Sequence, residues 1–140
     1  VWPDGEHALH PDGVTLYFTS LRPATPGGGD IFTSMWDGSN WGDPVNLGHP
    51  VNTIFKEMQP AFPSDGDTMS FASERNPLIG IAIYRSHRAG GEWSVPELVI
   101  SGITGEPTIT GDGSLLYFVH VLTDGSGGFD SDIWYCEKIE

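Results

Sequence analysis

The sequence predicts an all-β fold of β-propeller blades, with about three four-stranded antiparallel sheets in the chain. Two observations predict this class. The 140 residues include 19 glycines and 11 prolines, which is too many for long helices. The sequence also repeats itself roughly every fifty residues, a period within the range of propeller blades. The hydrophobic fraction of 38% is high enough for a folded core.

The first two strands of each repeat are predicted around an Asp-Gly pair. The pair lies in PDGVTLYFTS (11–20), SDGDTMSFAS (64–73) and GDGSLLYFVH (111–120). Because Asp-Gly between extended segments is a hairpin signal, it predicts one strand before the turn and an alternating strand after it. The strands before the turns are expected at 6–10, 59–63 and 106–110.

The third and fourth strands follow a second and a third recurring motif. Third strands are expected at DIFTS (30–34), AIYRS (82–86) and DIWYC (132–136), and fourth strands at WGDPVNL (41–47) and WSVPELV (93–99). The third repeat has no such fourth strand. The chain is therefore expected to be a single partial propeller domain (1–140) with blades at about 4–48, 57–100 and 105–140. Residues 1–3 are a candidate closure strand.

The same motifs, together with the string from Asn46 to Pro60 (NLGHPVNTIFKEMQP), resemble the TolB-like, WD-repeat-like β-propeller repeats of bacterial envelope proteins. The resemblance covers nearly the whole chain. It implies a propeller used for binding or scaffolding, and a periplasmic or secreted location. No signal peptide is recognisable in the sequence, so the compartment stays open. In the second repeat, Ala82 replaces the aspartate of the other two, and the Gly-rich run before the third strand is missing.

Charge narrows the range of partners. The formal net charge is −13, which argues against nucleic acid and anionic membrane surfaces as ligands. No apolar run is long enough for membrane insertion as a helix. Cations, glycans and basic protein surfaces remain as ligand classes.

Fewer than three complete repeats cannot close a ring, because propellers typically have at least four blades. Two arrangements would supply the missing blades. The chain could be a fragment of a longer propeller, or two copies could form a homodimer with a six-blade ring. We expect the homodimer, because a closed two-fold assembly is the commonest symmetric solution.

The candidate ligand site lies on the face that carries the long loops, since binding groups are usually displayed on loops of a rigid scaffold. A glutamate lies near the start of each first strand, arginines follow two of the second strands, and a histidine ends the third; these residues are Glu6, Glu57, Glu106, Arg22, Arg75 and His120. One interpretation is that the glutamates and arginines pair between blades. The other is a carboxylate-lined pocket at a central channel for a cation, a sugar or a peptide.

A calcium site is a weaker hypothesis. Asp124, Asp130 and Asp132 place three carboxylates in a Gly-rich segment, and calcium prefers oxygen ligands. The spacing does not fit an EF-hand, so a flexible loop in which Asp132 caps the following strand is the alternative. Otherwise no cofactor is expected.

Catalytic motifs are not recognisable: there is no nucleophile elbow, phosphate loop or HExxH helix. The sequence therefore favours a non-enzymatic binding or scaffold module with a protein or glycan ligand. The alternative is a glycan-acting hydrolase of the sialidase or glycosidase kind, using the channel-mouth carboxylates as its catalytic pair.

Overall fold

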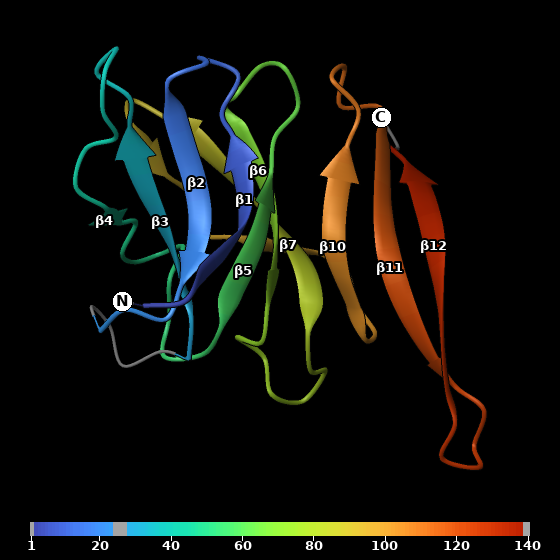
Figure 1. Cartoon of the computed structure of the whole chain (residues 1–140). Helices are drawn as coiled ribbons and strands as arrows, with labels where there is room; N and C mark the ends of the chain where they lie inside the picture. Colours follow the sequence, from blue (N-terminus) through green and yellow to red (C-terminus); the bar gives the residue numbers. More distant parts are fainter. Residues whose placement is uncertain (1, 24–27, 139–140) are drawn as a thin grey trace.

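A computed structural model describes residues 2–23 and 28–138, and the described chain consists of three antiparallel sheets joined by turns and loops (Figure 1). Sheet 1 has the order β1 (Asp4–Leu9), β2 (Thr15–Ser20), β3 (Asp30–Met35) and β4 (Val45–Asn46). In the described residues there is no helix long and apolar enough to cross a membrane. The expected all-β class is confirmed.

Sheets 2 and 3 follow the same strand order along the chain. Sheet 2 contains β5 (Glu57–Ala61), β6 (Thr68–Ser73), β7 (Ala82–Ala89), β8 (Glu92–Trp93) and β9 (Glu97–Ile100), and the last two both pair with β7. Sheet 3 contains β10 (Thr104–Ile109), β11 (Leu115–Thr123) and β12 (Phe129–Glu137). The three sheets thus match the three sequence repeats, and within the described residues the third sheet has three strands, as expected. Whether they are propeller blades stays a prediction.

The Asp-Gly turns form because the aspartate side chain binds the backbone that follows it. Asp12 Oδ1 accepts the N–H groups of Val14 (2.9 Å) and Thr15 (2.8 Å). The glycine after the aspartate has a positive φ in every repeat: 75° at Gly13, 70° at Gly66 and 71° at Gly113. A residue without a Cβ adopts this conformation without steric cost, which explains the recurring pair.

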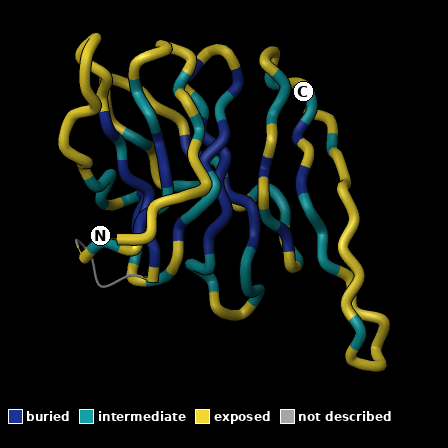
Figure 2. Tube along the Cα trace, viewed as in Figure 1, coloured by how far each residue is buried: buried dark blue, intermediate teal, exposed yellow. Residues whose placement is uncertain are grey.

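The sheets pack face to face, with their first strands next to one another. β1 contacts β5, and β5 contacts β10. Between sheets 1 and 2, the core contains Tyr17, Ile31, Met69, Phe71 and Tyr84, all buried. A second and smaller core lies between sheets 2 and 3. It contains Ile83, Leu116 and Phe118. Figure 2 shows the buried segments concentrated in the first two sheets, whereas most of β12 is exposed.

Several predicted boundaries are wrong. The first strands begin two residues earlier than expected, at Asp4, Glu57 and Thr104. The connection between the second and third strands of sheet 3, expected over 121–131, is much shorter, because β11 and β12 extend their pairing as far as Thr123 and Phe129. The fourth strand of sheet 1 is only two residues long. Of the candidate closure strand, residue 1 lies outside the described residues, and residues 2 and 3 are not in a strand.

Candidate functional site

The candidate site is a cavity of about 290 Å³ between the first strands of the three sheets. Its lining residues are Glu6, His7, Gln59, Pro60, Glu106, Pro107 and Thr108. Gln59 connects the sheets. Its Nε2 donates to Glu6 Oε1 (3.2 Å), and its Oε1 accepts the N–H of Glu106 (2.8 Å). One amide side chain therefore joins all three sheets at this cavity.

An unusual backbone conformation presents these side chains to the cavity. Glu6, Gln59 and Glu106 have φ values of 49°, 58° and 52°, which lie in the left-handed region. A β-bulge interrupts the register at this point of all three first strands. Left-handed backbone costs a non-glycine residue roughly 1–2 kcal/mol. Because the same strain occurs at three equivalent positions, we infer that the packing of the sheets holds these three side chains toward the cavity.

The register shows that the predicted set of three equivalent glutamates is wrong by one member. Glu6 and Glu106 occupy the bulge position, but in sheet 2 the bulge residue is Gln59. Glu57 lies two residues earlier and pairs with Ser73, where sheet 1 pairs Asp4 with Ser20. The glutamates near the starts of the first strands are therefore not at equivalent positions, because the strand register follows the bulge.

Glu57 is fully buried and tied to its surroundings. Its carboxylate accepts the N–H of Thr53 (2.6 Å), the hydroxyl of Thr53 (2.8 Å) and the hydroxyl of Ser73 (2.8 Å). Arg75 Nη2 lies 3.7 Å from it and donates to the carbonyl of Val51 (2.6 Å). Burial lowers the pKa of Arg75, and Glu57 acts in the opposite direction. Glu57 and Arg75 therefore hold the loop before β5 rather than a ligand.

Sheet 1 contains the same arrangement in a more exposed form. Arg22 donates from Nε to the hydroxyl of Ser20 (2.8 Å) and from Nη2 to Asp4 (2.6 Å). The guanidinium also lies over the rings of Phe18 and Phe32, at 5.5 and 5.2 Å from their centroids. Partial burial raises the pKa of Asp4, but hydrogen bonds from Ser20 and Arg22 outweigh it and lower the pKa overall. For the arginines, the structure thus matches the interpretation as structural pairs, within sheets rather than between them.

In sheet 3, other residue types occupy the positions of the carboxylate, the serine and the arginine. Thr104 and His120 form the equivalent cross-strand pair, and Leu122 takes the position of the arginine. His120 packs edge-on against Trp134, with ring centroids 5.7 Å apart. The buried hydroxyl of Thr104 has no hydrogen-bond partner in the described part of the chain. His120 is not among the residues that line the cavity of Glu6, Gln59 and Glu106.

The proposed calcium ligands are not brought together. Asp124 Oδ1 closes the β11–β12 turn by accepting the hydroxyl of Ser126 (2.7 Å) and the N–H groups of Ser126 (2.8 Å) and Gly128 (3.0 Å), and these bonds lower the pKa of the carboxyl. Asp130 and Asp132 lie within β12, so Asp132 does not cap the strand. No group of three His, Cys, Asp or Glu residues suited to a metal ion occurs in residues 2–23 and 28–138.

Gln59 and His7 are cavity residues that were missed from the sequence. The signal for Gln59 was its position: it lies 53 residues after Glu6 and 47 before Glu106, the same offsets as the three Asp-Gly turns. The expected first strands 6–10, 59–63 and 106–110 already place Gln59 level with Glu6 and Glu106, but the candidate set was restricted to carboxylates at this point.

Comparison with known proteins does not add a family. The sequence matches no protein-family model, and no curated protein matches it.

Proposed function

We propose that this chain is a non-enzymatic β-propeller module that binds a cationic group of a protein partner at the cavity of Glu6, Gln59 and Glu106. Support for the propeller comes from the order of the strands. In each sheet the strands follow one another in the order of the chain, apart from the branch at β9. The first strands of neighbouring sheets lie against one another, as the inner strands of blades do around a propeller axis.

The observation that carries the binding proposal is the repeated left-handed residue at the cavity. Glu6 and Glu106 place two carboxylates there, in a chain with a net charge of −13. The Glu106 carboxylate has no hydrogen bond or ion pair within the described residues, so it is free to accept one from a ligand. An acidic cavity on an acidic molecule attracts lysine and arginine side chains before other ligand classes.

A glycan-acting hydrolase has less support. A glycosidase needs one carboxylic acid and one carboxylate on the two sides of the bond. Glu57 is buried and hydrogen-bonded, so it cannot reach a substrate. Glu6 is already a partner of Gln59, which leaves Glu106 as the one cavity glutamate without a partner in the described chain.

The test is titration of the protein with a short lysine-rich peptide at low ionic strength, followed by calorimetry. Glu106→Gln removes one cavity charge with little change of shape. We expect it to weaken binding about five-fold, the effect of losing one solvent-accessible ion pair. The double variant Glu6→Gln/Glu106→Gln should weaken binding further.

The matched control is Glu74→Gln, which removes the same charge outside the cavity. It should bind the peptide as the unmodified chain does, apart from a small general electrostatic effect. Equal weakening in Glu74→Gln and Glu106→Gln would mean that the peptide responds only to net charge, and the cavity proposal would fail.

A further inference from the structure

Two exposed sheet faces of this chain carry residues equivalent to those that are buried between two of its own sheets. The existing interface lies between sheets 1 and 2. There Tyr17 lies 4.6 Å from Phe62 and 6.3 Å from Trp93 between ring centroids, and Ile31 is buried in the same core. We call Tyr17 and Ile31 of sheet 1 the inserted residues of this interface. Phe62 and Trp93 of sheet 2 are its receiving residues.

Sheet 3 carries the inserted residues a second time. The register places Tyr117 at the position of Tyr17, because each lies opposite the first residue paired after the bulge. Ile133 is opposite Val119 as Ile31 is opposite Thr19. Tyr17 is 2% exposed and Ile31 0%, whereas Tyr117 is 38% exposed and Ile133 79%. The same residue types are therefore buried in one sheet and uncovered in the other.

We call this surface the Tyr117 face: Tyr117, Val119, Ile133 and Tyr135. It points away from sheet 2, because side chains alternate along a strand and the intervening Leu116, Phe118 and Cys136 pack toward Ile83. Tyr117 and Tyr135 are cross-strand neighbours with ring centroids 5.9 Å apart. Figure 2 shows β12, which carries half of the face, as exposed along most of its length.

Sheet 1 carries the receiving residues a second time. Leu9 occupies the position of Phe62, and Trp41 the position of Trp93. The second equivalence follows from pairing, since Trp41 bridges Trp36 as Trp93 pairs with Arg88. Phe62 and Trp93 are partly buried against the core, but Leu9 is 55% exposed and Trp41 is 46% exposed.

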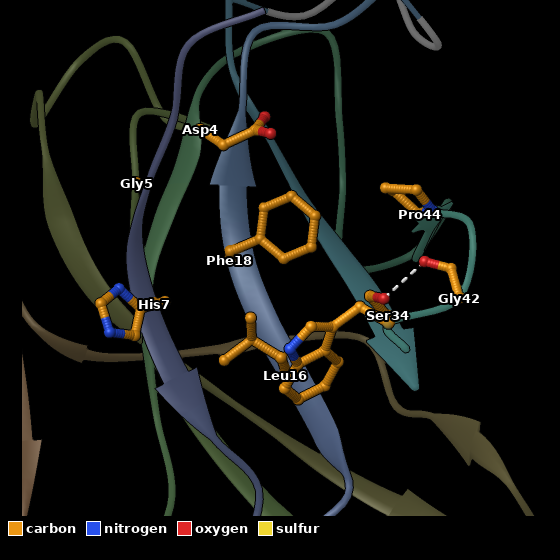
Figure 3. A pocket seen from close by; sticks show the side chains of 9 residues that line it. Asp4, Gly5, His7, Leu16, Phe18, Ser34, Gly42 and Pro44 are labelled. Carbon is orange, nitrogen blue, oxygen red and sulfur yellow. Dashed lines mark hydrogen bonds between the residues drawn. The ribbon is translucent and has the colours of Figure 1, made fainter. Parts of the chain in front are cut away.

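We call this second surface the Phe18 face: Leu9, Leu16, Phe18, Ser34 and Trp41. It opens into a cavity of about 290 Å³ lined by Leu16, Phe18, Ser34 and Trp41 among others (Figure 3). The hydroxyl of Ser34 donates to the carbonyl of Gly42 (2.7 Å), so the polar group at its edge is already satisfied. The Ser34 hydroxyl therefore keeps its hydrogen bond when apolar side chains enter this cavity.

We propose that the Tyr117 face of one copy of this chain docks on the Phe18 face of a second copy, repeating the contact of sheet 1 with sheet 2. Tyr117 then packs against Leu9 and Trp41 of the other copy, as Tyr17 packs against Phe62 and Trp93. The occupant is a second copy because the two faces carry apolar residues at the register positions that form the two sides of the interface between sheets 1 and 2. Each copy offers both faces, so two copies joined at two such contacts form a closed ring of six sheets. This inference rests on the propeller part of the proposed function.

The experiment is sedimentation equilibrium of the chain from low to high micromolar concentration. The expected particle has twice the 15.2 kDa mass of the chain. Ile133→Glu places a charge on the Tyr117 face, and Leu9→Glu places one on the Phe18 face. Each should weaken association by more than about ten-fold, because docking would bury an unpaired carboxylate. Both residues are largely exposed, so both variants should fold, which circular dichroism verifies.

Mixing the two variants tests the head-to-tail arrangement. Ile133→Glu keeps its Phe18 face and Leu9→Glu keeps its Tyr117 face, so the mixture should associate more strongly than either variant alone. It should remain weaker than the unmodified chain, because only one of the two contacts is intact. The control is Leu78→Glu, at a residue that is 92% exposed and outside both faces, which should leave association unchanged.

Three results would overturn the inference: a monomer at every concentration, a dimer that neither variant weakens, or a mixture that associates no better than its components. A dimer lost in Ile133→Glu but kept in Leu9→Glu would indicate two Tyr117 faces in contact, which also contradicts it. Titrating the Ile133→Glu monomer with the lysine-rich peptide separates the two proposals, because the cavity of Glu6 and Glu106 is intact in that variant.

Discussion

Replacing Glu57 with glutamine is expected to destabilise this chain far more than replacing Asp4 with asparagine. The two carboxylates occupy the same position in their sheets, opposite Ser73 and Ser20. They differ in burial: Glu57 is fully buried, whereas Asp4 is exposed. The comparison therefore contrasts a buried and an exposed carboxylate at the same register position, each with a serine opposite and an arginine nearby.

The magnitude follows from the contacts of Glu57. Its oxygens accept hydrogen bonds from the N–H and hydroxyl of Thr53 and from Ser73, and Arg75 lies 3.7 Å away. In Glu57→Gln, an amide nitrogen at either oxygen position faces a hydrogen-bond donor. The substitution also leaves Arg75, which is partly buried, without its counter-charge. Removing one member of a buried ion pair costs about 3–5 kcal/mol, and glutamine keeps part of the hydrogen bonding, so we expect about 3 kcal/mol. For Asp4→Asn the expected cost is about 0–1 kcal/mol, as for an exposed pair.

Urea unfolding followed by tryptophan fluorescence measures both values, at one protein concentration. A loss of about 3 kcal/mol corresponds to a melting temperature lower by roughly 10 °C in a domain of this size. Glu74→Gln is the control for the loss of a glutamate charge, and it should change stability by less than about 0.5 kcal/mol. If Glu57→Gln costs no more than Asp4→Asn, the reasoning that burial makes this network stabilising is refuted.

Two further predictions concern backbone strain and pH. Glu106 has φ 52° and its side chain has no hydrogen bond in the described residues, so Glu106→Gly should be more stable than Glu106→Ala by about 1 kcal/mol in urea unfolding. The opposite order, which is usual within strands, would show that the left-handed backbone is not strained. For Asp12, partial burial raises the pKa, but the N–H of Val14 and the N–H and hydroxyl of Thr15 outweigh it and lower the pKa to about 2 from 3.8. Because the folded pKa is the lower one, the contribution of Asp12 is complete above pH 3.8 and is lost as the pH falls toward 2. Asp12→Asn should therefore be less stable than the unmodified chain at neutral pH, and the difference should shrink between pH 4 and 2; a constant difference would contradict this.

Much of the fold could be predicted from local patterns. The three Asp-Gly turns mark three hairpins, and the alternating residues after them form β2, β6 and β11. The third sheet has three strands in the part of the chain that the structure describes, and the sequence likewise shows no fourth-strand motif in the third repeat. These features depend on residues close together in the chain, where turn chemistry and side-chain alternation act directly.

The candidate site was predictable only in part, because it depends on strand register. Glu6 and Glu106 do line the candidate cavity, but Glu57 is a buried structural residue. Gln59 lies in the cavity where Glu57 was expected. The bulge that decides this has no signature in the residue types, since glutamate and glutamine rarely adopt a positive φ. Asp130 and Asp132 were misplaced for a similar reason: β11 and β12 pair further than their Gly-rich connection suggested.

The sequence by itself therefore determined that the chain is all-β, that it contains three repeated units, and that its charge is strongly acidic. Only the tertiary structure decided which residues face the cavity and which equivalent side chains are covered. Tyr17 and Tyr117 show the physical reason: they are the same residue at the same position of the repeat, yet one is buried and the other exposed. Their difference depends on whether another sheet packs against them, and that is a property of the neighbours in space.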